Sequence, residues 1–212
     1  MAVPATDRYQ QHRAQAILAA ASVFSEKGFH GATTKDIAER LGIKQGSLYY
    51  YFASKEEALE EVCLFGISDY VQRMDEIAAS DQPFEARLLG VLTSHLTSYR
   101  EKNEALKVHN DERLYLPADR RKRLKELGTH YREKLERIFE DGVADGTLRG
   151  SLDCHFAAQS VIGLCNAWGE IIVRDPALDV FTVIQKCADL LLTGFRERRS
   201  RQRSDPGPRS PS

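Results

Sequence analysis

Residues 33–57, TTKDIAERLGIKQGSLYYYFASKEE, decide how the N-terminal part of this 212-residue chain folds. Thr33 and Asp36 have the spacing of a capping box, in which two side chains satisfy backbone amides at the start of a helix. Gly42 is typical of a helix end. A short element with three tyrosines and a phenylalanine in a row follows. The stretch therefore predicts two short helices joined by a tight turn.

Further helices flank this stretch. Residues 8–28 carry an apolar stripe at helical spacing, and Gly28 ends it. Ser54 and Glu57 form a second capping box, which predicts a long helix over residues 55–79. The stripe of the first helix consists of Ala14, Ile17, Leu18, Ala21 and Phe24.

The rest of the chain also has helical patterns. A helix follows Pro83, a polar patch that ends at Pro117 interrupts the pattern, and another helix covers residues 119–145. Two more helices are expected over residues 153–173 and 178–195. Since no stretch alternates like a strand, the predicted fold class is all-α.

Composition limits the function classes. Hydrophobic residues make up 42% of the chain and charged residues 29%, as in ordinary globular proteins. No apolar run approaches the roughly 20 residues of a membrane span, and the first residues lack the apolar stretch of a signal peptide. We expect a cytoplasmic protein with no membrane partner.

The sequence contains no pattern typical of an enzyme, a metal site or a bound cofactor. Nucleophile-elbow, phosphate-loop and dinucleotide motifs are absent, and no two histidines lie three or four residues apart on one predicted helix. The cysteines have neither CxxC nor zinc-ligand spacing, so we interpret them as core thiols. They are Cys63, Cys154, Cys165 and Cys187.

Charge is unevenly distributed, although the net charge is only -1. Residues 1–55 have a balance of +3, residues 56–104 of -7 and residues 195–212 of +4. A basic head on an acidic body fits a polyanionic partner at the N-terminal end. An ordinary solvated surface is the alternative explanation.

The tyrosine-rich element has two faces if it is helical. Leu48 and Phe52 lie four residues apart and face the core, while Tyr50 points most directly outward. The outer surface then offers hydroxyl groups, the amide of Gln45 and the bare backbone of Gly46, which suit the phosphates and base edges of a DNA duplex. Packing of the tyrosines against a neighbouring helix is the alternative.

This stretch resembles the DNA-binding domain of the TetR family of bacterial transcriptional regulators. The resemblance covers about residues 10–60 and rests on the motifs FSEKG, TTKDIA, LGI and GSLYYYF, followed by SKEE. It implies an all-α homodimer with one reading head per subunit. The residues that would approach bases or nearby phosphates are Gln45, Gly46, Ser47 and Tyr50. Those on the phosphate side would be Thr33, Thr34, Lys44, Tyr49, Tyr51 and Lys55.

The resemblance also implies a division into domains. Residues 1–54 would form a three-helix helix-turn-helix DNA-binding domain, and residues 55–195 a helical ligand-binding and dimerisation domain. Residues 196–212 read as a disordered basic tail. This tail either adds non-specific DNA affinity or only aids solubility.

The two C-terminal helices carry a predicted dimer interface. Small residues recur at helical spacing within residues 153–173, with aliphatic residues beside them, which allows a second helix to approach closely. Apolar residues within 178–195 spread over more than one face. A bundle that buries all of them inside one subunit is the alternative. The predicted interface residues are Ser160, Gly163, Leu164, Ala167, Ile171, Ile184 and Leu191.

The middle of the second domain loosely resembles the acyl-CoA-responsive branch of the family. In that branch, basic residues at the mouth of an apolar pocket meet the phosphates of the ligand. The basic residues would be Arg113, Arg120, Arg121 and Lys125. The pocket residues would be Tyr99, Leu114, Tyr115, Tyr131 and Trp168, with Asn166 and Glu170 as polar contacts. A solvated helix face and ordinary core packing are the alternatives.

These features predict a ligand-responsive transcriptional regulator. The working hypothesis is a repressor that a small apolar ligand, such as an acyl-CoA, releases from its operator. Two heads would enter successive major grooves about 34–36 Å apart, and the ligand would change their separation by tilting the helix over residues 55–79. A helical adaptor that binds protein through the tyrosines is the alternative, but only DNA binding should weaken steeply with salt.

Overall fold

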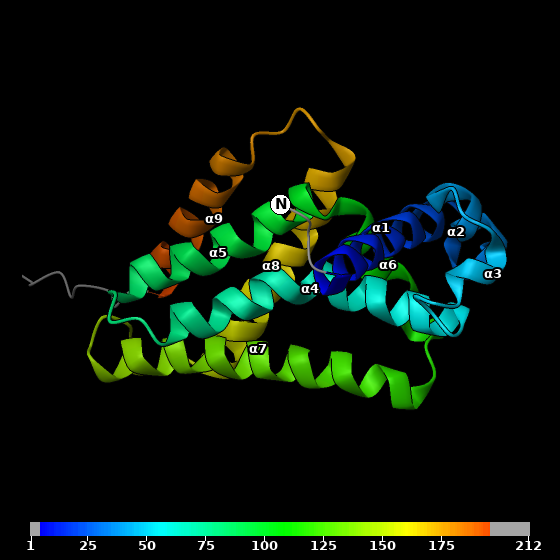
Figure 1. Cartoon of the computed structure of the whole chain (residues 1–212). Coiled ribbons are helices and arrows are strands. Elements are labelled where there is room, and N and C mark those ends of the chain that lie inside the picture. Colours follow the sequence, from blue (N-terminus) through cyan, green and yellow to red (C-terminus); the bar gives the residue numbers. More distant parts are fainter. Residues whose placement is uncertain (1–4, 196–212) are drawn as a thin grey trace, which may run out of the picture.

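The structure, a computed structural model, describes residues 5–195 and the side chains of residues 8–194. Within this part the chain forms nine α-helices and one short 3-10 helix, and no strand, which confirms the all-α prediction. Figure 1 shows an elongated molecule with the first three helices at one end. The predicted basic tail lies outside the described residues.

The N-terminal head is built by local signals. It consists of α1 (Ala5–Gly31), α2 (Thr34–Leu41) and α3 (Gln45–Leu48). Thr33 and Asp36 form the predicted capping box at the start of α2. Gly42 ends α2 with a φ of 74°, a left-handed conformation that favours glycine. Gly28 was predicted to end α1. Instead, it kinks the helix at a φ of 67°, and one further turn follows as far as Gly31.

Part of the predicted apolar stripe of α1 faces solvent. Ile17, Ala21 and Phe24 are buried, whereas Ala14 is exposed and Leu18 is 51% exposed. Leu18 lies about 100° around the helix from Ile17. Ala16, Ala19, Ala20 and Val23, which the stripe did not include, are buried. The buried face of α1 is therefore rotated around the helix relative to the predicted stripe.

Seven further elements follow the head. They are α4 (Lys55–Ala78), α5 (Phe84–Glu101), α6 (Asn103–Glu112), η1 (Arg113–Tyr115), α7 (Ala118–Ala144), α8 (Cys154–Arg174) and α9 (Val180–Phe195). The predicted boundaries of α4, α7, α8 and α9 agree with these to within two residues. The sequence did not predict α6 or η1. α6 follows α5 with only Lys102 between them, and it buries just Ala105, Leu106 and Val108, too few for a clear stripe.

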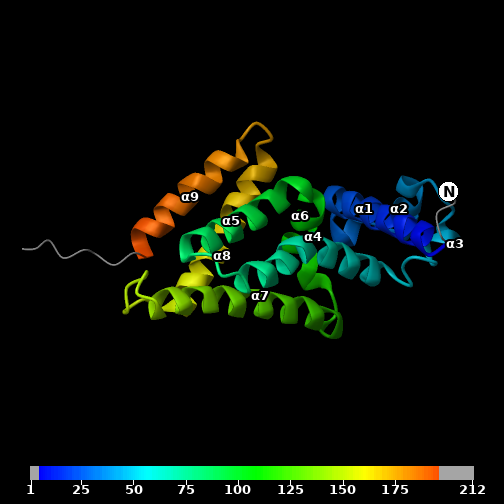
Figure 2. The same cartoon turned by 60° about the vertical axis from the view of Figure 1, so that its left-hand side comes forward.

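One helix connects the head to the body. α4 packs against α1 in the head and against α5, α6 and α7 in the body. In Figure 2 it runs along the length of the molecule from the head. Leu48 and Phe52 are each 2% exposed and close the core of the head together with Phe24 and Ile37. Burial of each such side chain stabilises the fold by roughly 1.5–3 kcal/mol.

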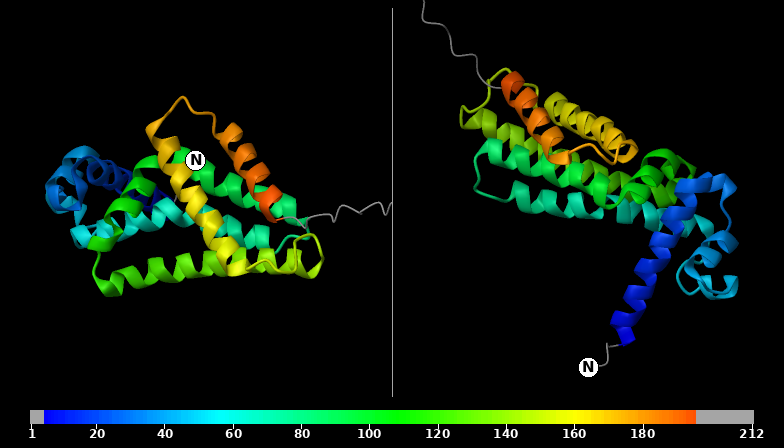
Figure 3. Two further views of the ribbon diagram at one scale, coloured as in Figure 1. Left: turned by 180° about the vertical axis from the view of Figure 1, so that it is seen from behind. Right: turned by 90° about the horizontal axis from the view of Figure 1, so that it is seen from above.

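α8 and α9 form the outer layer of the body. They pack on α5, and α8 also packs on α7 (Figure 3). Contrary to the prediction, α8 is long and apolar enough to cross a membrane by length and composition, but only 33% of its most apolar window is buried within the subunit. An apolar helix that packs with one face on a core and with the other on a second subunit meets the same criteria.

Candidate nucleic-acid interface and ligand pocket

The tyrosine-rich element presents its hydroxyl groups to solvent. Tyr50 is 80% exposed and Tyr49 is 58% exposed, while Leu48 and Phe52 anchor the element in the core. No neighbouring helix of the described chain covers these two tyrosines. The alternative in which they pack against such a helix is therefore excluded for Tyr49 and Tyr50.

The third tyrosine braces the element from the side. The ring of Tyr51 is half-buried and stacks on Tyr9 of α1, with the ring centroids 6.2 Å apart. The hydroxyl of Tyr9 donates a hydrogen bond to the backbone carbonyl of Tyr50 at 3.3 Å. This role of Tyr9 could not be predicted, because it depends on a contact between residues far apart in the chain.

The N-terminal end of α3 carries the predicted polar contacts. The amide nitrogen of Gln45 donates to the hydroxyl of Thr34 at 3.0 Å, which links α3 to the start of α2. Lys44 is exposed and Ser47 is half-buried. Nothing lies within 4 Å of the position that a Cβ atom would take at Gly46. The subunit itself therefore has room for a side chain at this position.

Two residues predicted to contact phosphate are already engaged within the head. The ammonium group of Lys55 donates hydrogen bonds to the carbonyls of Phe29 at 2.8 Å and Ala32 at 3.0 Å. It therefore binds the C-terminal end of α1 and does not extend into solvent. The hydroxyl of Thr33 serves the capping box with Asp36. Hydrogen bonds from Lys27 and then from Thr33 lower the pKa of Asp36 to about 2, so this carboxylate stays ionised at neutral pH.

Substitution of Tyr50 tests the reading face. We expect Tyr50→Ala and Tyr50→Phe to weaken operator binding by similar factors of about 10 to 100, because both lose a hydroxyl hydrogen bond to a charged phosphate, typically about 1.5–3 kcal/mol. Fluorescence anisotropy with labelled operator DNA measures the loss, and circular dichroism checks that the fold is intact. Unchanged affinity in both variants would remove Tyr50 from the interface.

Gly46→Ala should affect stability and DNA binding in opposite directions. A methyl group here meets open space in the free protein, and alanine in place of a helical glycine raises the free energy of unfolding by about 0.4–1 kcal/mol. Against a DNA backbone in close contact, the same methyl group costs about 1–3 kcal/mol, or at least about fivefold in affinity. Urea denaturation and operator titration measure the two effects. Equal affinity for both proteins would show that no close approach occurs at Gly46.

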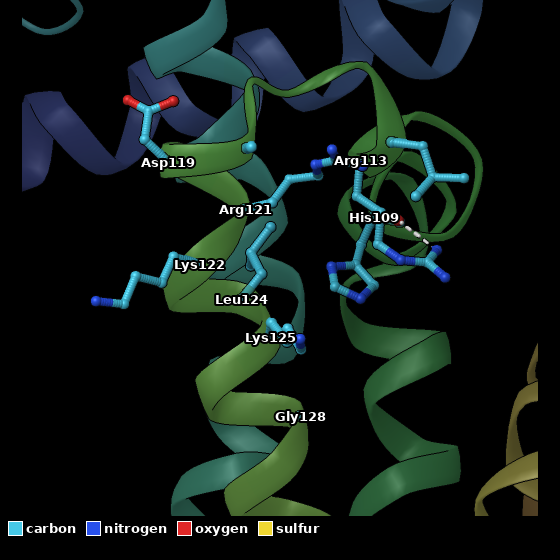
Figure 4. Close-up of a pocket in the computed structure, with 10 residues that line it drawn as sticks. His109, Arg113, Asp119, Arg121, Lys122, Leu124, Lys125 and Gly128 are labelled. Carbon is cyan, nitrogen blue, oxygen red and sulfur yellow. Dashed lines mark hydrogen bonds between the residues drawn. The ribbon is translucent and has the colours of Figure 1, made fainter.

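A large pocket opens between α6 and α7, which we call the vestibule. Its volume is about 810 Å³. It is lined by His109, Arg113, Leu114, Ala118, Asp119, Arg121, Lys122, Leu124, Lys125 and Gly128. In Figure 4, Arg121 extends from α7 towards the side of α6, whereas Asp119 and Lys122 point to the opposite side. The vestibule thus gathers the predicted basic residues Arg113, Arg121 and Lys125.

A smaller cavity adjoins the vestibule, and we call it the inner chamber. Its volume is about 160 Å³. The inner chamber and the vestibule share four lining residues, namely His109, Arg113, Leu124 and Gly128. The remaining lining residues of the chamber are Ile67, Tyr70, Val71, His95, Asn110, Tyr131, Ile162 and Asn166. The predicted pocket residues Tyr131 and Asn166 therefore lie here, whereas Leu114 lies in the vestibule.

The structure places the other predicted pocket residues elsewhere. Arg120 forms an ion pair with Glu60 of α4 at 2.6 Å and does not line the vestibule. Tyr115 stacks on Phe29 of the head, with ring centroids 6.2 Å apart. These two predictions are wrong, since both side chains tie the body to other elements.

Three more predicted residues lie outside both spaces. Tyr99 and Glu170 line a separate cavity of about 120 Å³. Tyr99 is hydrogen-bonded there to Asn110 and Asn166, at 3.2 Å each. Trp168 is half-buried against the core and lines neither the vestibule nor the inner chamber. A helical period fixes which side of a helix a residue lies on, but not which of two cavities it faces.

Three residues that line these spaces were not predicted. His109 and Gly128 lie in polar stretches without any motif, and His95 is a single histidine on an otherwise buried face of α5. Only the packing of α5, α6 and α7 brings them together. Among the described residues, no group of three or more His, Cys, Asp or Glu side chains could hold a metal ion.

α6 also contacts the head directly. The carboxylate of Glu112 accepts a hydrogen bond from the backbone amide of Phe29 at 2.9 Å, immediately after the kink at Gly28. The kink leaves this amide without a helical partner, and a carboxylate suits the positive end of the short turn that follows. Lys107 donates to the carbonyl of Ser25 at 2.6 Å. The helix that lines the vestibule is thus hydrogen-bonded to the head.

The outer face of α8 and α9 is apolar, and no other element of the described chain covers it. Its exposed large residues are Phe156, Ile171, Phe181 and Leu190, which are 70%, 43%, 67% and 65% exposed. Gly163 and Ala167 are exposed on the same helix as Ile171, and Ser160 and Leu164 are partly exposed. Ile184 and Leu191 are only 2% and 9% exposed, because they face the core of their own subunit. The structure therefore corrects the predicted interface at these two positions.

Comparisons with known proteins cover both parts of the chain. Residues 16–62 match the bacterial regulatory proteins of the tetR family, and residues 81–194 match the tetracyclin repressor-like C-terminal domain. The chain is 34% identical over 179 residues to the HTH-type transcriptional repressor KstR2 of Rhodococcus jostii. This alignment spans 83% of the chain and 87% of that protein.

Solved structures share the whole architecture. The ketosteroid transcriptional regulator KstR2 of Mycobacterium tuberculosis aligns with a TM-score of 0.77 at 25% identity, over 88% of this chain and 95% of that one. The transcriptional regulator FadR of Bacillus subtilis, solved in complex with stearoyl-CoA, aligns with a TM-score of 0.71 at 24% identity, over 86% and 98%. The head and the helical body thus have the same arrangement in these proteins.

Proposed function

Because this chain belongs to the TetR family of bacterial regulatory proteins and is a ligand-responsive DNA-binding repressor, we propose that an acyl-CoA thioester is the ligand that releases it from its operator. The observation that carries the proposal is the arrangement of the two spaces in the body. A basic vestibule of about 810 Å³ adjoins a chamber of about 160 Å³, and the two share four lining residues. FadR, which has the same fold, was solved with stearoyl-CoA.

The charges of the vestibule suit the phosphates of coenzyme A. Four of its lining residues are arginine or lysine, and one, Asp119, is acidic. Arginine and lysine make charge-assisted hydrogen bonds to phosphate oxygens, which are about twice as strong as neutral ones. A cleft of this volume is in the range that encloses most of a small ligand. Arg121 and Lys125 are our candidates for the phosphate contacts.

Arg113 would mark the boundary between the two parts of the ligand. Its guanidinium donates to the carbonyls of His109 at 3.0 Å and Asn110 at 2.6 Å, so its charge is fixed at the end of α6. It lines both the vestibule and the inner chamber. The thioester would lie near this residue, with the acyl group in the chamber beyond it.

Ligand binding would reach the head through α6 and α4. A ligand that spreads α6 from α7 displaces Glu112, which holds the amide of Phe29, and Tyr115, which stacks on the same residue. α4 packs against α6 as well as against α1 of the head. Two heads must lie about 34–36 Å apart to enter successive major grooves. A ligand releases DNA to the extent that it binds the spread form better than the DNA-bound form.

Glu112→Ala should uncouple the ligand from the head. We expect operator affinity without ligand to change less than threefold, while the ligand concentration needed for half-release rises about tenfold, since one hydrogen bond to a charged group contributes about 1.5–3 kcal/mol. Titration of the operator complex with the ligand measures this. Glu112→Gln keeps an acceptor oxygen and should restore part of the response.

Glu104→Ala is the matched control for Glu112. Glu104 also reaches from α6 to α1, where it accepts from the hydroxyl of Ser22 at 3.2 Å, but this contact is exposed. We expect its replacement to leave the ligand response unchanged. A normal response in Glu112→Ala would show that the signal does not pass through this contact.

Direct calorimetric titration tests the ligand class. We expect the protein to bind acyl-CoA thioesters at least tenfold more tightly than either free coenzyme A or the corresponding free acid, because each of these fills only one of the two spaces. Comparable affinity for coenzyme A alone would mean that the inner chamber does not take the acyl group. No binding of any thioester would overturn the proposal, and the repressor would then respond to another ligand.

A further inference from the structure

A buried histidine dominates the inner chamber. His95 of α5 is 2% exposed, and its ring is sandwiched between Tyr70, with centroids 4.3 Å apart, and Tyr99, with centroids 5.9 Å apart. Its Nδ1 atom lies 3.0 Å from the hydroxyl of Tyr131 of α7. Two stacked rings and one hydrogen bond thus fix the position of the imidazole among α4, α5 and α7.

The other nitrogen of this ring has no partner within the described part of the protein. Both Nε2 of His95 and Nδ1 of His109 are buried without a hydrogen bond. The side chain of Asn166 also lines the chamber and interacts with His95, but not in the geometry of a hydrogen bond, and its oxygen accepts a hydrogen bond from Tyr99 at 3.2 Å. A buried polar atom that remains unpaired costs about 1–3 kcal/mol. Both residues line the inner chamber, so a bound molecule can supply the missing contacts.

Both rings are neutral at physiological pH. Burial lowers the pKa of His95 to about 4, and the polar interaction with the side chain of Asn166 opposes this effect. Burial, and then the charge of Arg113, lowers the pKa of His109 to about 4. A neutral imidazole has one donor and one acceptor nitrogen. Whichever role Nδ1 of His95 takes towards Tyr131, Nε2 takes the other, and it suits a carbonyl oxygen or a hydroxyl group.

The size of the chamber restricts the occupant further. Its volume of about 160 Å³ corresponds to about five water molecules at roughly 30 Å³ each. Water can pair with the two histidines in the free protein. A saturated hydrocarbon that displaces this water leaves Nε2 of His95 unpaired, whereas a group with an oxygen atom replaces the lost hydrogen bond.

We propose that the inner chamber selects a compact acyl group that carries an oxygen atom beyond the thioester, as a ketone or a hydroxyl, and that His95 binds this oxygen. The inference rests on the proposed acyl-CoA function and specifies the substrate class of the same site. A long saturated acyl chain fits this chamber less well, both because of its volume and because of its lack of a hydrogen-bonding group.

Matched pairs of thioesters test this selection. Each pair consists of an oxoacyl-CoA or a hydroxyacyl-CoA and the analogue in which a methyl branch replaces the oxygen, for example 5-oxohexanoyl-CoA or 5-hydroxyhexanoyl-CoA with 5-methylhexanoyl-CoA. The series places the oxygen at each position from carbon 3 to carbon 6. For at least one pair, we expect the wild-type protein to bind the oxygen-bearing compound at least tenfold more tightly in calorimetric titration.

His95→Phe assigns the preference to its residue. Phenylalanine keeps a flat ring between Tyr70 and Tyr99 but cannot form hydrogen bonds, so the two members of the preferred pair should bind within about twofold of each other. Tyr131→Phe is the second variant. It retains Nε2 of His95 and should keep a preference for the oxygen-bearing compound, which also shows that the chamber tolerates substitution.

The outcomes separate the two proposals. Equal affinity within every pair for the wild-type protein would overturn the selection of an oxygen atom and leave the acyl-CoA function standing. A preference that persists in His95→Phe would overturn the role of His95. Failure of every thioester to bind would overturn both the acyl-CoA function and this inference.

Discussion

Gly163→Leu is expected to convert the protein to a monomer and to lower its operator affinity about 100-fold or more. Gly163 is exposed on α8, and nothing lies within 4 Å of a Cβ at this position, so the subunit itself accommodates a side chain. Against a second α8 in close contact, the leucine side chain clashes. A monomer places only one head on the operator, and loss of the second tethered contact typically costs a factor of about 10² to 10⁴.

Sedimentation velocity and operator titration measure the two parts of this result. Gly163→Ala is the matched control, because a single methyl group allows a much closer approach than leucine, and we expect it to remain dimeric. Circular dichroism of both variants should match that of the wild type. A Gly163→Leu protein that remains dimeric would place the interface away from this face, although Phe156 and Phe181 would then stay uncovered.

Reversal of the charge in the vestibule should have the second large effect. In the double variant Arg121→Glu and Lys125→Glu, we expect the acyl-CoA concentration needed for half-release to rise about 100-fold or more, while operator affinity without ligand stays within threefold. Each lost charge-assisted contact to a phosphate is worth about 1.5–3 kcal/mol, and the new carboxylates also repel the phosphates. Both residues belong to α7 and not to the three helices of the head.

Arg123→Glu provides the control for net charge. Arg123 is exposed on the same helix but does not line the vestibule. We therefore expect a change of less than threefold in the concentration for half-release. A similar loss in this variant and in the double variant would mean that the overall charge of the body, rather than a site for phosphates, governs ligand binding.

The head could be predicted because its signals are local. The capping box of Thr33 and Asp36 and the glycine at position 42 act within a few residues of themselves, so the sequence alone locates the start and the end of α2. The outward position of Tyr50 follows from helical spacing and two inward anchors. Lys55 is the counterexample, because its ammonium group binds carbonyls of residues more than 20 positions away.

The pocket could be predicted only in part because it is a product of packing. The basic run on α7 indicated Arg121 and Lys125 correctly as residues of one pocket, but Arg120 in the same run turns to Glu60 on α4. His95 gave no signal, since its role depends on Tyr131 in another helix. Helical spacing did place Gly163, Ala167 and Ile171 on an exposed face of α8, and their role in a dimer interface stays a prediction.

The measurement that tests the central claim most directly is release of operator DNA by acyl-CoA thioesters. Labelled DNA from the region next to the gene of this protein is bound first, and fluorescence anisotropy is followed during titration with a panel of thioesters, with free coenzyme A as the control. The account predicts that thioesters of one acyl class restore the anisotropy of free DNA, while coenzyme A alone does not. A complex that binds the operator but that no thioester disturbs would contradict it.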